Sequence, residues 1–367
     1  MVKHFFFVSR LDYKSGWGTL SINYLKELNP NEVIVFCNKK NTDINFKQIE
    51  TLHKPLDYLK NPFLIFFDYL KIKKVLQKYN SQNRYSHFPV EPYCLLLPFL
   101  RNMFSKNIYY AIGTYSLELK TNKKTKILFN MAQNKFDYII YFSSFTKEMV
   151  EKEIKFDNKI KKEIINPVIY LKDFKNKNYK KFKDRTILCV GELKPRKGFE
   201  SLIKVIIHLK KIYKKNYKLI LIGKSNNAFY KRKLLSIIKE NDVYQNIRFE
   251  HDVGEKKINN FYKKSHLFAM LSKKLGNHFE GFGIVYLEAL FYGLPVIISR
   301  ESGARDLLKV SDKIKVFNPD ETKKIANYVS KLFKNNRKIN PLIYRSILNK
   351  HLSINKLKLR KFYRKLI

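Results

Sequence analysis

Short apolar runs alternate with longer segments of helical period along most of this chain, and this alternation limits its fold more than any other feature. Runs rich in β-branched and aromatic residues predict strands, whereas apolar residues three or four apart predict helices. Strands that alternate with helices form βαβ units, so we expect mostly parallel sheets in an α/β fold. The predicted strands are Phe5–Val8, Val33–Phe36, Ile108–Ile112, Tyr138–Phe142, Thr186–Val190, Leu219–Ile222, Ile247–Glu250, Leu267–Leu271 and Pro295–Ser299.

The length of 367 residues predicts two such domains. A polar segment that is rich in Lys and Asn and has no apolar period separates them, at residues 169–184. We therefore predict a first domain at residues 1–168 and a second domain at residues 185–340. Residues 341–367 are basic and have a helical period, which predicts a C-terminal helix.

The net charge of +43, from 74 Lys and Arg against 31 Asp and Glu, favours an anionic surface as a partner. The alternative is a lysine-rich composition without functional meaning, because the lysines are spread along the whole chain. No run approaches the ~20 apolar residues that span a bilayer, and Met1–Val8 predicts a buried strand rather than a signal peptide. The three cysteines lie far apart, which fits a reducing compartment. We expect a cytoplasmic protein that is peripheral on the inner face of the cytoplasmic membrane.

Two carboxylates, Glu280 and Glu288, lie on either side of a glycine turn. The turn comes directly before an apolar stretch that predicts a helix from Ile284 to Tyr292. Backbone N–H groups at the start of a helix bind phosphate, and a carboxylate on each side suits the hydroxyls of a sugar and a ribose. This segment therefore predicts a site for a sugar nucleotide. Its candidate backbone ligands are Gly281, Phe282, Gly283, Ile284 and Val285.

Two further loops follow predicted strands. The loop after Thr186–Val190 carries three cations ahead of the next helix, and its candidate residues are Gly191, Lys194, Arg196 and Lys197. Arg forks onto phosphate oxygens and Lys acts as a point charge, so this loop predicts a diphosphate clamp. The loop after the first strand contains Gly16 and Gly18, which either let the backbone approach a ligand or only form a tight turn.

Several of these segments resemble the retaining glycosyltransferases of family 4, which have the GT-B fold. Glu280 to Glu288 matches the E-x7-E signature of that family, and Gly191 to Gly198 is similar to its phosphate loop. Residues 288–296 are similar to its EA-x3-G-x-PV segment. The resemblance covers residues 185–310 strongly and the N-terminal half weakly. It implies two Rossmann-like domains that face each other across a cleft, with the helix at 341–367 returning to the N-terminal, acceptor-side domain.

The resemblance also implies roles for the candidate residues. Lys197 would hold the donor diphosphate together with Arg196. Glu280 would hydrogen-bond the transferred sugar, and Glu288 would accept hydrogen bonds from the ribose. Gly16 and Gly18 would face the diphosphate from the other domain.

Three positions depart from the family pattern. Glu192 stands where the family usually has Arg, so Lys194 or Arg196 would supply the missing charge. Where the family often has a sugar-side His, this chain would use Thr114 or the backbone, and His87 is the nearest substitute. Asn166-Pro167-Val168 lacks the usual glycine.

We expect an enzyme that transfers a hexose from a nucleoside diphosphate sugar to a hydroxyl of a glycan or lipid-linked acceptor in cell-envelope polysaccharide or lipopolysaccharide synthesis. Because no Asp-x-Asp motif is present, we expect neither a metal requirement nor a cofactor. The aromatic and basic stretch at residues 61–74 either seats on an anionic leaflet or forms a core helix with a solvated lysine end. The alternatives are a sugar-nucleotide epimerase, a phosphorylase and a catalytically silent subunit. A nucleic-acid-binding protein would leave Glu280 and Glu288 unexplained.

Overall fold

The computed structural model describes residues 3–13, 15–79, 83–100, 102–170, 179–224, 227–334 and 340–366. The chain divides into two compact units. Unit 1 consists of Met1–Tyr170 together with Leu352–Ile367, and unit 2 consists of Leu171–His351. The linker predicted at 169–184 lies partly outside the described residues, because 171–178 are not among them.

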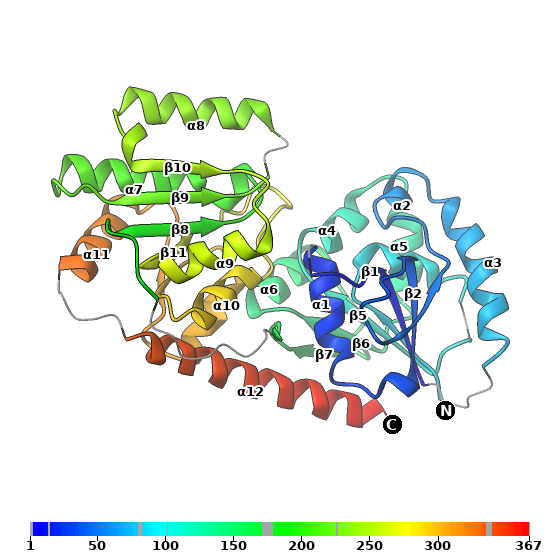
Figure 1. Cartoon of the computed structure of the whole chain (residues 1–367). Coiled ribbons are helices and arrows are strands. Elements are labelled where there is room, and N and C mark those ends of the chain that lie inside the picture. The colour runs from blue at the N-terminus through cyan, green and yellow to red at the C-terminus, as the bar shows by residue number, and fades with distance from the viewer. Residues whose placement is uncertain are drawn as a thin grey trace. The chain divides into compact units, whose positions relative to one another are not determined.

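Unit 1 is built on a seven-stranded parallel sheet in the order β3-β2-β1-β4-β5-β6-β7 (Figure 1). The aromatic run of β1 is fully buried, since helices cover both faces of a parallel sheet. The strands are β1 (His4–Arg10), β2 (Val33–Lys39), β3 (Lys47–Glu50), β4 (Tyr85–Phe88), β5 (Lys106–Ala111), β6 (Tyr138–Tyr141) and β7 (Lys161–Ile164). The helices are α1 (Gly16–Leu25), α2 (Asp57–Lys60), α3 (Leu64–Leu76), α4 (Thr114–Thr121), α5 (Lys126–Gln133) and α6 (Ser144–Glu153).

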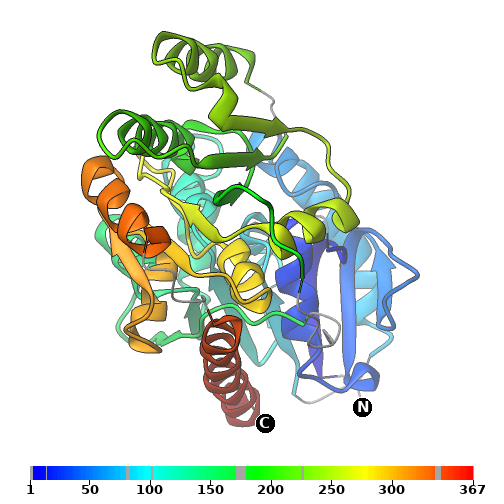
Figure 2. The same cartoon turned by 60° about the vertical axis from the view of Figure 1, so that its left-hand side comes forward.

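Unit 2 has a six-stranded parallel sheet in the order β10-β9-β8-β11-β12-β13. The strands are β8 (Thr186–Val190), β9 (Lys218–Ile222), β10 (Ile247–Glu250), β11 (Leu267–Met270), β12 (Val296–Ser299) and β13 (Lys315–Phe317). The helices are α7 (Phe199–Lys211), α8 (Ala228–Glu240), α9 (Glu255–Lys264), α10 (Ile284–Phe291) and α11 (Thr322–Lys334). Figure 2 shows α7 and α11 side by side, in agreement with the contacts between them.

In both units, the strand order indicates where a ligand would bind. Each sheet begins at a central strand, adds two strands on one side and then returns to the other side. This is the doubly wound order, and ligands bind outside the carboxyl ends of the strands where the order reverses. The reversal lies between β1 and β4 in unit 1, and between β8 and β11 in unit 2.

The last helix, α12 (Pro341–Leu366), contributes residues to both units. Its first turn packs in unit 2, where a side chain on Gly293 would collide with Pro341. Its last turns pack in unit 1: the ring of Phe362 lies 5.3 Å from the ring of Tyr138, and the Tyr363 hydroxyl donates to the carbonyl of Tyr24 over 3.3 Å.

The predicted α/β class is confirmed, and each predicted strand is present to within three residues at either end. The prediction missed β3, β4, β7 and β13. The missed strand β4 contains His87, which was a candidate for the sugar side of the site.

Candidate functional site

The loops that follow β8 and β11 meet at the carboxyl edge of the unit 2 sheet. The loop after β8 ends in the short 3₁₀ helix Pro195–Lys197 and then in Gly198, whose φ of +72° is in the left-handed region. A Cβ on Gly198 would lie 1.8 Å from the carbonyl oxygen of Leu271, which directly follows β11. Glycine therefore lets the cationic loop press against the end of the neighbouring strand.

This packing brings Glu280 to two of the predicted cations. Glu280 is 9% exposed, and its carboxylate accepts a hydrogen bond from Arg196 over 3.0 Å and pairs with the Lys197 ammonium. Burial alone would raise the pKa of Glu280, but the two cations outweigh burial and hold that pKa below its ordinary value. Glu280 is therefore ionised at neutral pH.

The backbone around Glu280 is fixed by the turn after β12. The Gly303 N–H donates to the Glu280 carbonyl over 3.0 Å, and the Ser302 hydroxyl donates to the Phe282 carbonyl over 3.2 Å. Ser302 is fully buried. The turn after β12 thus fixes the backbone at Glu280 and at Phe282.

Helix α10 begins directly after this segment, with Gly283 as its N-cap. Because Gly283 has no side chain, the N-cap residue makes no side-chain hydrogen bond to the start of this helix. The first N–H groups of a helix have no acceptor within it, and Gly283, Ile284 and Val285 are partly exposed here. Gly281 and Phe282 are buried, and the ring of Phe282 packs 5.6 Å from the ring of His351, so Phe282 offers the site only its backbone.

Glu288 lies one turn into α10 and is partly buried. Its carboxylate accepts a hydrogen bond from the hydroxyl of Tyr262, which is buried, over 2.9 Å. Burial raises the pKa of Glu288, and the Tyr262 hydrogen bond opposes the rise. One carboxylate oxygen is thus held in place by Tyr262.

The other cation of the loop, Lys194, is placed differently. Its ammonium lies 3.0 Å from the carboxylate of Glu192, and both side chains are substantially exposed. Of the two residues expected to compensate for Glu192, the structure brings Arg196 to Glu280 and pairs Lys194 with Glu192 itself. Gly191 lies directly after β8, beside the Lys197 side chain.

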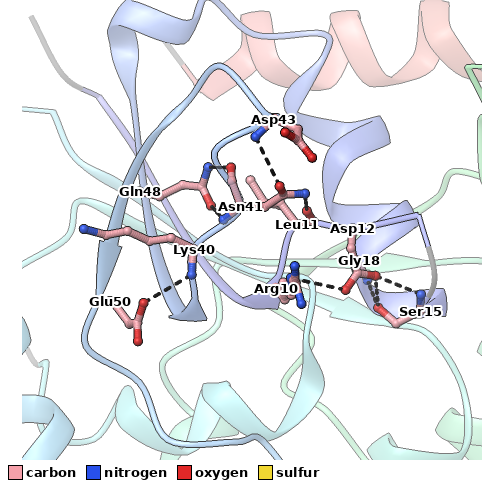
Figure 3. Close-up of polar contacts among 10 residues, drawn as sticks. All are labelled: Arg10, Leu11, Asp12, Ser15, Gly18, Lys40, Asn41, Asp43, Gln48 and Glu50. Carbon is pink, nitrogen blue, oxygen red and sulfur yellow. Dashed lines mark hydrogen bonds and ion pairs between the residues drawn. The ribbon is translucent and has the colours of Figure 1, made fainter.

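In unit 1, the predicted glycine loop follows β1 and is held by a network around Asp12 (Figure 3). Asp12 accepts from the Ser15 N–H and hydroxyl over 2.9 and 3.0 Å, and the Ser15 hydroxyl accepts from the Gly18 N–H over 3.0 Å. A Cβ on Gly18 would lie 2.5 Å from the Asp12 carbonyl oxygen, whereas Gly16 is exposed with open space beside it. Gly18 is therefore required for packing, and Gly16 is the glycine that a ligand could approach.

The prediction that His87 lies on the sugar side is wrong. His87 is fully buried in β4 and its ring stacks on Phe6 with 4.2 Å between ring centroids. Each ring nitrogen is paired at 3.0 Å, one with the Nδ1 atom of His4 and the other with the Tyr110 hydroxyl. Burial strongly lowers the pKa of His87, so it is a neutral core residue.

Thr114, the other sugar-side candidate, is the first residue of α4 and is partly exposed. The turn before it is held by Glu91, a fully buried carboxylate that the sequence did not single out. Its position in the sequence could have identified it, because Glu91 is a single carboxylate within an apolar run. The strand that precedes this run, β4, was itself not predicted.

In the part of the chain that the structure describes, no group of three or more His, Cys, Asp or Glu side chains is close enough to hold a metal ion. None of the described helices combines the length and apolar character that a membrane span requires.

Comparisons with known proteins agree with this geometry. Residues 172–347 match the family model described as glycosyl transferases group 1. A relative from Haemophilus influenzae, named an uncharacterized glycosyltransferase, is 25% identical over 81% of this chain and 80% of its own length. A GDP-mannose-dependent monoacylated alpha-(1-6)-phosphatidylinositol monomannoside mannosyltransferase from Corynebacterium glutamicum is 34% identical, but over only 34% of this chain and 32% of its own.

Among solved structures, Anabaena HepE in complex with UDP aligns with 100% of this chain and 99% of its own at a TM-score of 0.72. The sequence identity is 14%, so this likeness establishes the GT-B type of fold alone. The family match covers the whole described site of unit 2, from the cationic loop to α10. Residues 172–347 of this chain therefore belong to the group 1 glycosyl transferases.

Proposed function

We propose that the protein transfers a hexose from a nucleoside diphosphate sugar to a hydroxyl of a glycan or lipid-linked acceptor, with retention of the anomeric configuration and without a metal. The observation that carries this proposal is the cluster of Arg196, Lys197 and Glu280 at the strand-order reversal of unit 2, beside the start of α10. It combines cations, bare helix N–H groups and a sugar-binding carboxylate in one place.

Each group of the cluster has a role in this reaction. Lys197 and Arg196 hold the diphosphate, and the N–H groups of Gly283, Ile284 and Val285 add partial positive charge beside it. As the glycosidic bond breaks, negative charge grows on the leaving diphosphate, and preorganised cations stabilise it in the transition state. This charge stabilisation replaces the metal ion that other transferases use.

The carboxylates orient the donor. Glu280 touches both cations, so a sugar hydroxyl that donates to Glu280 lies next to a diphosphate held by them. Glu288 uses one oxygen for Tyr262 and offers the other to the ribose hydroxyls. Neither carboxylate transfers a proton in this scheme.

Known relatives suggest which donors to try first. The Anabaena protein binds UDP and the Corynebacterium protein uses GDP-mannose on a phosphatidylinositol mannoside. We infer a UDP- or GDP-sugar donor and a lipid-linked or envelope-glycan acceptor.

A thermal-shift screen tests the donor proposal. UDP-glucose, UDP-galactose, UDP-N-acetylglucosamine and GDP-mannose are each added to the full-length protein, with UMP and GMP as controls. A donor at 100 times its Kd raises stability by about 2.7 kcal/mol, which is several degrees in Tm. If none of the donors stabilises the protein more than the monophosphates do, the proposed function is wrong.

We also propose that unit 1 carries the contact with an anionic membrane, through an α3–α5 face. This face consists of exposed apolar side chains at the start of α3 and on α5, and includes Phe63 at 78% and Ile127 at 72% exposure. Its other members are Phe66, Phe67, Leu70 and Met131. The segment between α4 and α5 is joined to the α2 end by two hydrogen bonds, from Asn122 to the Leu59 carbonyl and from Lys124 to the Lys60 carbonyl.

Lysines are frequent in the sequence next to these side chains: Lys60, Lys71, Lys73, Lys74, Lys120, Lys123, Lys124 and Lys126. Aromatic groups enter the interface of a bilayer while lysines pair with anionic headgroups. Such a position would bring the acceptor side of the enzyme to a lipid-linked substrate.

Vesicle sedimentation tests this face. We expect the full-length protein to bind vesicles with phosphatidylglycerol and to ignore pure phosphatidylcholine. Changing Phe63, Phe66 and Phe67 to Ser should weaken binding by at least about ten-fold, because several apolar groups are lost. The matched control is Phe229→Ser, which removes a residue of 75% exposure from α8 in unit 2. Equal losses in both variants would contradict the assignment.

A further inference from the structure

Glu91 is a buried carboxylate for which the proposed reaction has no role. It begins the 3₁₀ helix Glu91–Leu96, which follows β4 after two residues, and it is fully buried. The strand order of unit 1 reverses between β1 and β4, so Glu91 lies at the edge where a ligand of unit 1 would bind.

Four donors converge on this carboxylate. Oε1 accepts from the N–H groups of Ile112 and Gly113 over 3.2 and 3.0 Å and from the Ser116 hydroxyl over 3.0 Å. Oε2 accepts from the indole Nε1 of Trp17 over 3.2 Å. Burial raises the pKa of Glu91, and the four donors oppose that rise.

These contacts join the segments that follow three neighbouring strands. Trp17 lies in the first turn of α1, the helix that follows β1, while Glu91 follows β4, and Ile112 and Gly113 follow β5. The indole ring of Trp17 also lies 4.7 Å from the ring of Tyr115, at the start of α4. The side chains of Trp17 and Tyr115 are partly exposed, whereas Glu91 is fully buried.

We propose that Trp17 and Tyr115 form an aromatic platform on which the C–H face of a pyranose packs, and that Glu91 is the positioning residue that holds this platform. The inference rests on the proposed glycosyl transfer and adds a sugar subsite to unit 1. Partly exposed, rigidly held aromatic rings at a ligand edge are the usual lining of such sites.

The chemistry of the contacts makes a carboxylate necessary. All four partners are donors that need an acceptor, and both carboxylate oxygens are used. An amide has one acceptor oxygen and one NH2 group. Glu91→Gln would therefore turn a donor toward either Trp17 or the Ile112 and Gly113 amides, and the platform would loosen.

Trp17 is the only tryptophan of the protein, so its fluorescence reports the platform alone. We expect Glu91→Gln to shift the emission of Trp17 to longer wavelength and to raise its quenching by acrylamide about two-fold, because the indole loses its partner and gains solvent. Asp68→Asn is the matched control. Asp68 is another fully buried carboxylate of unit 1, and it accepts from the His53 N–H and the Tyr58 hydroxyl. This control should lower Tm without changing the Trp17 emission.

The sugar is tested with octyl α-D-mannopyranoside and octyl β-D-glucopyranoside below their micelle concentrations, with 1-octanol as the control for the alkyl chain. We expect at least one glycoside, and not octanol, to change the Trp17 fluorescence saturably. Its affinity should fall at least about five-fold in Glu91→Gln and stay within two-fold in Asp68→Asn.

The inference is overturned if Glu91→Gln leaves the Trp17 emission and quenching at the wild-type values, or if octanol acts like both glycosides. The fluorescence measurements need no nucleotide-sugar donor. If the donor screen fails while the expected fluorescence changes occur, the result counts against the proposed function. If the donor screen succeeds while the fluorescence changes are absent, the result counts against the platform.

Discussion

At the scale of single residues, the site of unit 2 depends on a nearly buried carboxylate and the two cations that neutralise it. Glu280 is nearly buried, and its cost of desolvation is offset by Arg196 and Lys197. The same three groups that stabilise unit 2 are the ones we assign to the donor. Stability and donor binding should therefore both depend on the charge of Glu280.

The pH dependence of stability tests this charge. The pKa of folded Glu280 lies below its ordinary value of 4.5, so its ionised form stabilises the fold above pH 4.5. That stability is lost as the pH falls through the folded pKa. We expect Glu280→Gln to cost about 2–3 kcal/mol at pH 7, with the gap to wild type constant down to about pH 5 and narrowing below the ordinary pKa. Urea unfolding of both proteins from pH 7 to pH 3 measures the gap. A gap that widens on acidification would contradict the pairing.

Glu288 is assigned to the ribose, and its role can be isolated by changing the ligand as well as the protein. Once the donor base is known, wild type should bind the nucleoside diphosphate about ten-fold more tightly than its 2′,3′-dideoxy analogue, because one charged hydrogen bond contributes about 1.5–3 kcal/mol. In Glu288→Gln this preference should shrink to about two-fold. Calorimetric titration of the four combinations gives the coupling. An unchanged preference in the variant would move the ribose elsewhere.

At the scale of elements, the site is made by a tight junction of the β8 loop with the end of β11. Gly198 permits this junction through its positive φ and through the contact with Leu271 that any side chain would block. The same loop then starts α7, so the cations and the helix are placed together.

Two glycine substitutions separate backbone strain from this close contact. Gly198→Ala should cost about 3 kcal/mol or more in the free energy of unfolding, since it adds both strain and a clash. Gly276→Ala has a similar φ of +58° with nothing within 4 Å of the new Cβ, so we expect about 1 kcal/mol from strain alone. Denaturant titrations measure both. Similar losses in the two variants would show that the contact with Leu271 is unimportant.

The strands that were predicted from the sequence differ in polarity from those that were missed. Long runs of apolar residues, such as those of β2 and β9, marked strands that are covered on both faces. The edge strands β3 and β7 consist mainly of charged and polar residues, as is common for strands with one free edge. In β4, Ser86 and His87 are polar yet fully buried, because partners far away in the sequence satisfy them.

Dependence on partners far away in the sequence also limits what could be predicted of the site. The glycines and carboxylates of residues 280–288 are close together in the sequence, so their pattern could be recognised from the sequence alone. The pairing of Lys194 with Glu192 and the burial of His87 depend on tertiary packing. Leu357, which lies in the helical period of the last helix, is 54% exposed although Leu359 beside it is fully buried.

At the scale of the whole molecule, the last helix gives unit 1 part of its core. Phe362 is fully buried there, although it lies more than 190 residues after the rest of that unit ends at Tyr170. The integrity of unit 1 thus depends on the end of the chain.

The substitution Phe362→Ala tests this dependence. It should destabilise unit 1 by about 3–5 kcal/mol, the usual cost of removing a buried Phe. Unfolding followed by Trp17 fluorescence reports unit 1, and thermal stabilisation by the donor reports unit 2. We expect the first transition to move to lower denaturant while donor binding at 20 °C stays within two-fold. Loss of donor binding with an intact Trp17 signal would contradict this division.

The central claim is that the cations of the β8 loop hold the diphosphate of a nucleotide sugar. Calorimetric titration of the donor's nucleoside diphosphate into wild type, Lys197→Ala and Lys204→Ala tests it most directly. Lys204 lies on α7 and is paired with Glu200 at 3.0 Å, so its variant removes the same charge from the same unit. The account predicts that Lys197→Ala weakens binding at least about ten-fold and that Lys204→Ala changes it less than two-fold. Equal affinities in Lys197→Ala and wild type would contradict it.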